Sequence, residues 1–130
     1  MFAERGVHLP EAISMAQRAV DLDPQNGAYL DSLGWAYYKS GQYSLAEENL
    51  QKANNRIGTD PQVHDHLGDV YEKTGKLKEA VSQWERSMTE YAHSLPADAD
   101  PEDIAKVQHK LESARVKLAR NSGGDHKESK

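Results

Sequence analysis

The sequence predicts an all-α fold, a solenoid built from antiparallel helix pairs, and three observations lead to this prediction. The chain of 130 residues matches itself when it is shifted by 34 positions. Its apolar residues recur at spacings of three and four, which is the period of one face of an α-helix. Glycine and proline fall between these segments, where they end one helix or begin the next. Repeats of this length are typical of solenoids, in which each unit buries its apolar face on its neighbours.

The period is carried by identical residues at equivalent positions of successive units. The pairs are Asp31 and Asp65, Leu33 and Leu67, Gly34 and Gly68, Tyr37 and Tyr71, Lys39 and Lys73, Gly41 and Gly75, Ala46 and Ala80, and, one unit earlier, Ala12 and Ala46, and Ala19 and Ala53. No insertion is needed to keep the register, so the units are expected to follow one another directly.

The first predicted helix covers residues 10–22, within a truncated unit over residues 9–26. Only eight residues precede Leu9, too few for a partner helix. We therefore interpret residues 1–8 as disordered or as the start of a fragment cut from a longer array. One apolar side of this helix would be uncovered, and we expect self-association through it.

Residues 27–60 and 61–94 form the two complete units. Helices are expected over residues 27–39, 43–56, 61–73 and 77–93. The inward side chains predicted for the first of these units are Leu30, Leu33, Ala36 and Tyr37 on its first helix and Leu45, Ala46, Leu50 and Ala53 on its second. Gly41 suits the left-handed residue after a helix end, and Pro61 suits a first helical turn.

Two glycines lie inside predicted helices, at Gly34 and Gly68. Glycine costs about 1 kcal/mol relative to alanine at such a position. Close approach of the paired helix would offset this cost, with Ala46 and Ala80 as the small residues on the facing helices.

Residues 95–120 are expected to form a loop and a capping helix. Asp100 is the predicted N-cap and Pro101 begins a helix that should continue to about residue 119. Its inward stripe is Ile104, Val107, Leu111, Ala114 and Leu118, and its basic residues Lys106, Lys110, Arg115, Lys117 and Arg120 are expected on a solvated face or at the helix C-terminus. Residues 121–130 are polar and are expected to be a disordered tail.

Two motifs show a resemblance to a known family. Leu30-x2-Leu33-Gly34-x2-Tyr37 followed by Ala46-x3-Leu50, and His64-x2-Leu67-Gly68-x2-Tyr71 followed by Ala80-x3-Trp84, resemble the tetratricopeptide repeat, especially that of bacterial members. The resemblance covers roughly residues 9–93 and departs from the pattern at Ala16, Gly58 and His64. It implies a right-handed solenoid of about two and a half units with a cap, the C-terminal part of a longer array.

The resemblance also implies a function, which is non-catalytic binding of a peptide or protein segment as an adaptor or scaffold. Carried over by position, the concave groove would present Asp31, Trp35, Tyr38, Lys39, Asp65, Asp69, Glu72 and Lys73. Four acids against two lysines predict a neutral to basic partner with an apolar anchor, and Trp35 and Tyr38 are the expected hot spots. Family members that clamp acidic chaperone tails use Lys and Asn here, so such tails are not expected. Two alternatives stay open: a substrate-recruiting arm of a larger enzyme, and a self-association module.

Other classes of function are disfavoured by composition and spacing. The net charge of −5 argues against nucleic acid, and no apolar run is long enough to span a membrane. Cysteine is absent, and His64 and His66 point apart on a helix, so no cofactor or metal is predicted. No catalytic motif is present, and we do not expect an enzyme. The compartment stays open between cytoplasm and periplasm.

Overall fold

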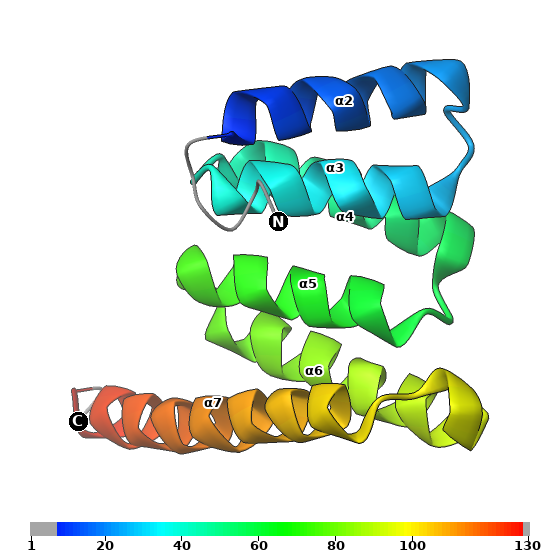
Figure 1. Cartoon of the computed structure of the whole chain (residues 1–130). Coiled ribbons are helices and arrows are strands. Elements are labelled where there is room, and N and C mark those ends of the chain that lie inside the picture. Colours follow the sequence, from blue (N-terminus) through cyan, green and yellow to red (C-terminus); the bar gives the residue numbers. More distant parts are fainter. Residues whose placement is uncertain (1–7, 129–130) are drawn as a thin grey trace.

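A computed structural model describes residues 8–128 of the chain, and all regular elements in that range are helices. They are α2 (Leu9–Leu22), α3 (Gly27–Lys39), α4 (Tyr43–Ile57), α5 (Pro61–Lys73), α6 (Leu77–His93), the short 3-10 helix η1 (Pro96–Asp98) and α7 (Pro101–Glu128). Figure 1 shows them stacked in chain order, with α4 behind α3 and α7 passing in front of α6. The predicted all-α solenoid of helix pairs is confirmed.

The helices of the two complete units begin and end at the predicted residues, except that α4 ends at Ile57, one residue later than expected. Local contacts explain several of these boundaries. Asn26 caps α3 by accepting a hydrogen bond from the Tyr29 N–H at 3.1 Å, and Asp60 caps α5 by accepting one from the Gln62 N–H at 2.9 Å. The α3–α4 and α5–α6 turns each contain a glycine with positive φ, 81° at Gly41 and 79° at Gly75. Other residues rarely adopt this conformation, so glycine separates the paired helices.

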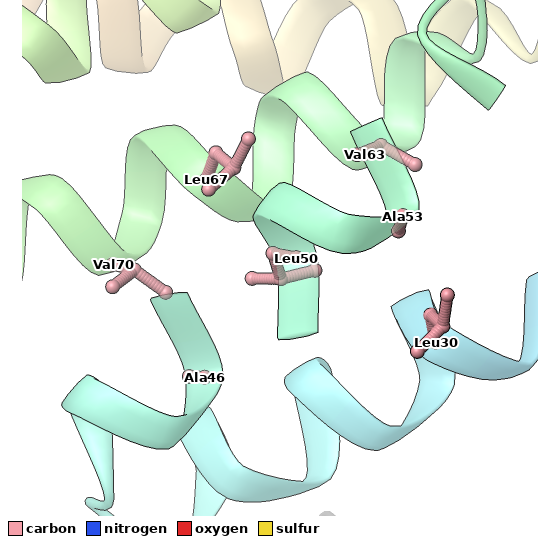
Figure 2. Close-up of a cluster of buried hydrophobic side chains, with 7 residues drawn as sticks. All are labelled: Leu30, Ala46, Leu50, Ala53, Val63, Leu67 and Val70. Atoms are coloured by element: carbon pink, nitrogen blue, oxygen red, sulfur yellow. The ribbon is translucent and has the colours of Figure 1, made fainter. Parts of the chain in front are cut away.

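The core lies between the paired helices and continues from one unit to the next. Figure 2 shows its central cluster, whose members come from α3, α4 and α5: Leu30, Ala46, Leu50, Ala53, Val63, Leu67 and Val70. Gly34 and Gly68 make the predicted close approach to the paired helix, but the nearest side chains are Leu50 and Trp84 rather than the expected Ala46 and Ala80. A Cβ at Gly34 would lie 2.6 Å from Leu50 Cγ, and one at Gly68 would overlap the Trp84 indole.

The prediction that Leu45 points into the core is wrong. Leu45 is exposed, and Asn49 is buried on the inner side of α4 instead. The Asn49 side-chain amide donates to the Leu45 carbonyl at 2.8 Å, which satisfies a polar group that burial would otherwise destabilise. Ala46, Asn49, Leu50 and Ala53 therefore share the buried face, and Leu45 lies beside it.

α7 packs on α6 through a second apolar cluster, which joins Ala80, Val81 and Trp84 to Val107, Leu111 and Ala114. Asp100 accepts a hydrogen bond from the Glu102 N–H at 2.9 Å, as expected of its N-cap role. α7 continues to Glu128, so residues 121–128 are helical where a disordered tail was expected. Extending an existing helix needs no new nucleation, which favours helix beyond the apolar stripe. Residues 129 and 130 lie outside the described range.

The outer side of α2, at the N-terminal end of the stack, is not covered by another helix of the described chain. α2 has no buried residue, and Met15 and Leu22 are 66% and 87% exposed. Residues 1–7 of the segment that we expected to be disordered or a fragment start lie outside the described residues; the His8 carbonyl accepts a hydrogen bond from the Ala12 N–H at 3.0 Å. In the described part of the chain, no helix has the length and apolarity needed to cross a membrane.

Candidate functional site

The eight residues predicted to line a groove all lie on α3 and α5, and Figure 1 shows α3 in front of its partner α4. We call the surface formed by Asp31, Trp35, Tyr38, Lys39, Asp65, Asp69, Glu72 and Lys73 the front face. Its α3 half is mainly aromatic and its α5 half is mainly ionic, because the two units carry different residues at equivalent positions.

Trp35 is the centre of the aromatic half. Its ring stacks on Tyr38, with centroids 4.7 Å apart and planes inclined by 9°, and on His66 of α5, at 4.1 Å and 18°. Lys39 Nζ lies 5.0 Å from the Trp35 ring centroid, within the range of a cation–π contact. Tyr43 of α4 meets Tyr38 in a tilted arrangement at 5.7 Å. Trp35 is thus half-buried by contacts with side chains of its own chain.

His66 joins the two units, and the sequence interpretation did not assign it to the site. Its Nδ1 lies 2.8 Å from Oδ1 of Asp31, and both side chains are 13% exposed. Because a carboxylate only accepts, the ring N–H donates in this hydrogen bond. The offset of 35 residues, one more than the repeat, is consistent with a place on the helix next to that of Asp31, but the repeat does not specify which side chain Asp31 meets.

The ionic half is organised around a residue of α7. Lys110 Nζ lies 2.9 Å from Oδ1 of Asp65 and 3.0 and 3.1 Å from the two carboxylate oxygens of Asp69. Its side chain is 32% exposed. The expectation that Lys110 belongs to a solvated face or a helix end is therefore wrong: α7 lies beside α5, and its lysine turns toward two carboxylates that share one side of that helix.

These contacts shift several pKa values. Burial and repulsion from Asp65 raise the pKa of Asp69 to about 6, although Lys110 pulls it down. Burial alone would lower the pKa of Lys110, but attraction to Asp69 and Asp65 outweighs it and raises that pKa. Burial and the nearby charge of Asp69 raise the pKa of Tyr38 to about 12. At neutral pH the pair of acids and the single lysine carry one net negative charge.

Asp65 also connects the front face to the core. The Trp84 indole N–H donates to Oδ1 of Asp65 at 3.1 Å and approaches its backbone carbonyl at 3.3 Å. Trp84 is fully buried. Asp65 therefore accepts from a core side chain and from α7, which makes it a structural residue as well as a surface one.

The total charge of the front face differs from the prediction once α7 is included. Lys117 of α7 lies 3.6 Å from Glu72, so α7 adds two lysines, Lys110 and Lys117, to the two expected from sequence. Four carboxylates then face four lysines. The surface is close to neutral, because helix stacking supplies the cations that the repeat itself lacks.

The two histidines of the His64-Asp65-His66 segment point to different neighbours. His64 is buried, with Nδ1 2.7 Å from the Gln83 side-chain oxygen and Nε2 2.7 Å from the Gly58 carbonyl. His66 binds Asp31 instead. Among the side chains that the structure describes, no group of three or more from His, Cys, Asp or Glu is arranged to hold a metal ion.

Comparison with known families gives one match within the first complete unit. The model described as tetratricopeptide repeat matches residues 28–56. A TPR repeat-containing protein of Pseudomonas aeruginosa is 37% identical over 67 residues, which are 52% of this chain and 11% of the relative. The match thus spans about a tenth of that protein's length.

Solved structures with the same fold are similar over most of the chain. The type III secretion translocator chaperone SycD of Yersinia enterocolitica has a TM-score of 0.80 at 22% identity, covering 89% of this chain and 78% of that one. PcrH, solved in complex with the chaperone-binding region of PopD, has a TM-score of 0.79 at 19% identity, covering 88% and 84%. The first TPR of Spaghetti (RPAP3), bound to an HSP90 peptide, has a TM-score of 0.74 at 19% identity, covering 91% and 90%. At these identities the likeness is one of fold.

Proposed function

We propose that the chain is a tetratricopeptide-repeat protein that binds a peptide or protein segment across the front face as a non-catalytic adaptor or scaffold module. The observation that carries the proposal is the half-buried aromatic cluster of Trp35, Tyr38, Tyr43 and His66. Large rigid rings supply contact area at low entropic cost and are enriched among interface hot spots. Two proteins of similar fold, PcrH and RPAP3, were solved with a bound segment or peptide.

The contacts within the aromatic cluster restrict what a partner can offer. Tyr38, His66 and Lys39 already lie against the Trp35 ring, so stacking positions on the indole are taken. An apolar side chain packed against the ring edges fits this arrangement better than another stacked ring. The balance of carboxylates and lysines favours a neutral segment, and the excess negative charge of the Asp65, Asp69 and Lys110 group tolerates a basic one.

Selection of peptides from a random library tests the proposal. We expect selected sequences to be neutral or basic and to contain an aliphatic residue. Trp35→Ala should weaken their binding by about thirtyfold or more, since truncating an interface hot spot costs at least about 2 kcal/mol. Lys52→Ala is the matched control, because Lys52 is an exposed residue of α4, away from the front face, and should leave affinity unchanged.

Two outcomes of the titrations would count against the proposal. Equal affinities of the wild type and Trp35→Ala for the selected peptides would move the binding site away from the front face. Tighter binding of the acidic HSP90 peptide SRMEEVD than of a neutral selected peptide would contradict the expected charge of the partner.

Self-association is a second candidate function, favoured by the exposed apolar side of α2. Met15, Arg18, Ala19 and Leu22 line an open hollow of about 270 Å³ on that helix. Exposed apolar area of this kind often marks a contact surface. Sedimentation equilibrium should show a rising mass with concentration that Met15→Glu together with Leu22→Glu abolishes. A strict monomer at high concentration would exclude this candidate.

A further inference from the structure

We propose that Asp31 and His66 form a clamp between the two units that positions Trp35 for binding, with His66 as the positioning residue. The proposal rests on the proposed function of the front face and deepens it, because it identifies what keeps the central ring in place. The clamp is the hydrogen bond between Asp31 and His66 together with the stack of His66 on Trp35.

The stack fixes the indole from the neighbouring unit. Trp35 and Tyr38 lie on the same helix, so their contact alone cannot relate α3 to α5. His66 belongs to α5, and its ring lies 4.1 Å from the Trp35 centroid with an interplanar angle of 18°. Rings at this distance and inclination attract each other beyond simple burial of apolar area. Trp35 therefore contacts a ring on each of two adjacent helices.

Asp31 fixes the ring that does the stacking. The hydrogen bond of 2.8 Å joins side chains that are both largely shielded from water, which strengthens it relative to an exposed pair. Because Nδ1 is held, rotation of the imidazole about its Cβ–Cγ bond would break the bond. Asp31, His66 and Trp35 are thus connected in sequence across the boundary between the units.

The clamp is a property of this boundary and not of every repeat. Asp65 occupies the position equivalent to Asp31, yet it binds Trp84 and Lys110. Asp69 occupies the position equivalent to Trp35 and has no ring to present. If the contacts served only to stack the repeats, the same contacts would be expected at the next boundary. They occur instead at the boundary beside the aromatic cluster, which connects them to the front face.

A positioned Trp35 would favour binding because its freedom is already lost in the free protein. Immobilising a side chain on association lowers affinity, and a side chain held in advance avoids that loss. Removing the clamp should therefore weaken binding of a selected peptide by about three- to tenfold while leaving the fold intact.

The first experiment uses the free protein and needs no partner. Its two tryptophans give two indole N–H signals in a proton–nitrogen correlation spectrum, and Trp35→Phe assigns them. In His66→Ala the Trp35 signal should shift and its order parameter should fall, whereas the signal of buried Trp84 should stay in place. Asp31→Ala should have a similar effect, and Asp31→Asn, which keeps an acceptor oxygen, should restore the wild-type signal.

The second experiment measures binding of a peptide selected on the wild type. His66→Ala should bind about three- to tenfold more weakly, and Asp31→Asn should bind as the wild type does. An unchanged Trp35 signal in a folded His66→Ala protein would overturn the clamp, whatever the binding data show. A disordered Trp35 with unchanged affinity would overturn its role in binding and leave the proposed function standing. Failure to select any peptide would instead count against the proposed function, while the spectra still decide whether the clamp exists.

Discussion

The two complete units share one core plan but differ at two kinds of position. In the first unit Leu50 packs over Gly34, and in the second Trp84 packs over Gly68. The Trp84 indole comes closer to its glycine than Leu50 does, and its N–H donates a hydrogen bond to Asp65. The position that packs over the glycine therefore accommodates either leucine or tryptophan. Tryptophan adds a hydrogen bond that connects the core to the surface residue Asp65.

The front face shows the second difference. Trp35 and Tyr38 of the first unit correspond to Asp69 and Glu72 of the second, so an aromatic surface is followed by a carboxylate surface. The aromatic half is held by contacts among α3, α4 and α5. The carboxylate half is completed by Lys110 and Lys117 of α7. The second unit thus depends on the capping helix for its surface as well as for its core.

The largest expected effect concerns the glycine contacts. Gly68→Ala should lower the free energy of unfolding by about 3 kcal/mol, because the new methyl overlaps the rigid Trp84 indole. Gly34→Ala is the matched change in the first unit. It should cost about 1 kcal/mol, since Leu50 can shift and alanine regains helix propensity. Urea unfolding followed by circular dichroism measures both values, and equal losses would contradict the difference between the units.

A smaller effect is expected from the lysine of the ionic half. Lys110→Met keeps the alkyl chain but leaves Asp65 and Asp69 facing each other, so stability should fall by about 2 kcal/mol. Lys106→Met, an exposed change on the same helix, should alter it by less than about 0.5 kcal/mol. Amide hydrogen exchange should show faster opening in α5 and α7 than in α3 for the Lys110 variant. A uniform increase in exchange rates along the chain would contradict a local effect of Lys110 on α5 and α7.

The smallest effect is a dependence of stability on pH through Asp69. Its pKa is raised from 3.8 to about 6 in the folded chain, so the folded state holds this proton more tightly than the unfolded state does. The contribution of Asp69 should therefore increase stability by about 1 kcal/mol as the pH falls from about 7 to about 5. Asp69→Asn should remove that part of the dependence, which the difference between the two urea-unfolding series measures. A wild-type series parallel to that of Asp69→Asn would contradict the raised pKa.

Sequence alone determined the helix pairs because their signals are local. Apolar spacing, the glycine turns and Pro61 all act within a few residues, so they predict where a helix begins, where it ends and which side is apolar. The caps Asn26 and Asp60, which were not predicted, are local contacts as well. The repeat predicts that Gly34 and Gly68 both approach the paired helix, because equivalent positions pack alike. It did not predict that the side chains they meet are Leu50 and Trp84. Leu45 was misplaced because it lies at the edge of the stripe, where period alone does not separate buried from exposed.

The tertiary structure alone decided the partners of the surface residues. Asp31 meets His66 across 35 positions and Asp65 meets Lys110 across 45, distances at which the period no longer specifies an atom-to-atom contact. These contacts depend on how far one helix is rotated and shifted against the next, and on where α7 lies beside α5. Sequence placed the eight predicted residues on two equivalent helices but missed His66 and the lysines of α7. Helix stacking decided that the aromatic ring is held from the neighbouring unit and that α7 neutralises much of the acidity of the front face.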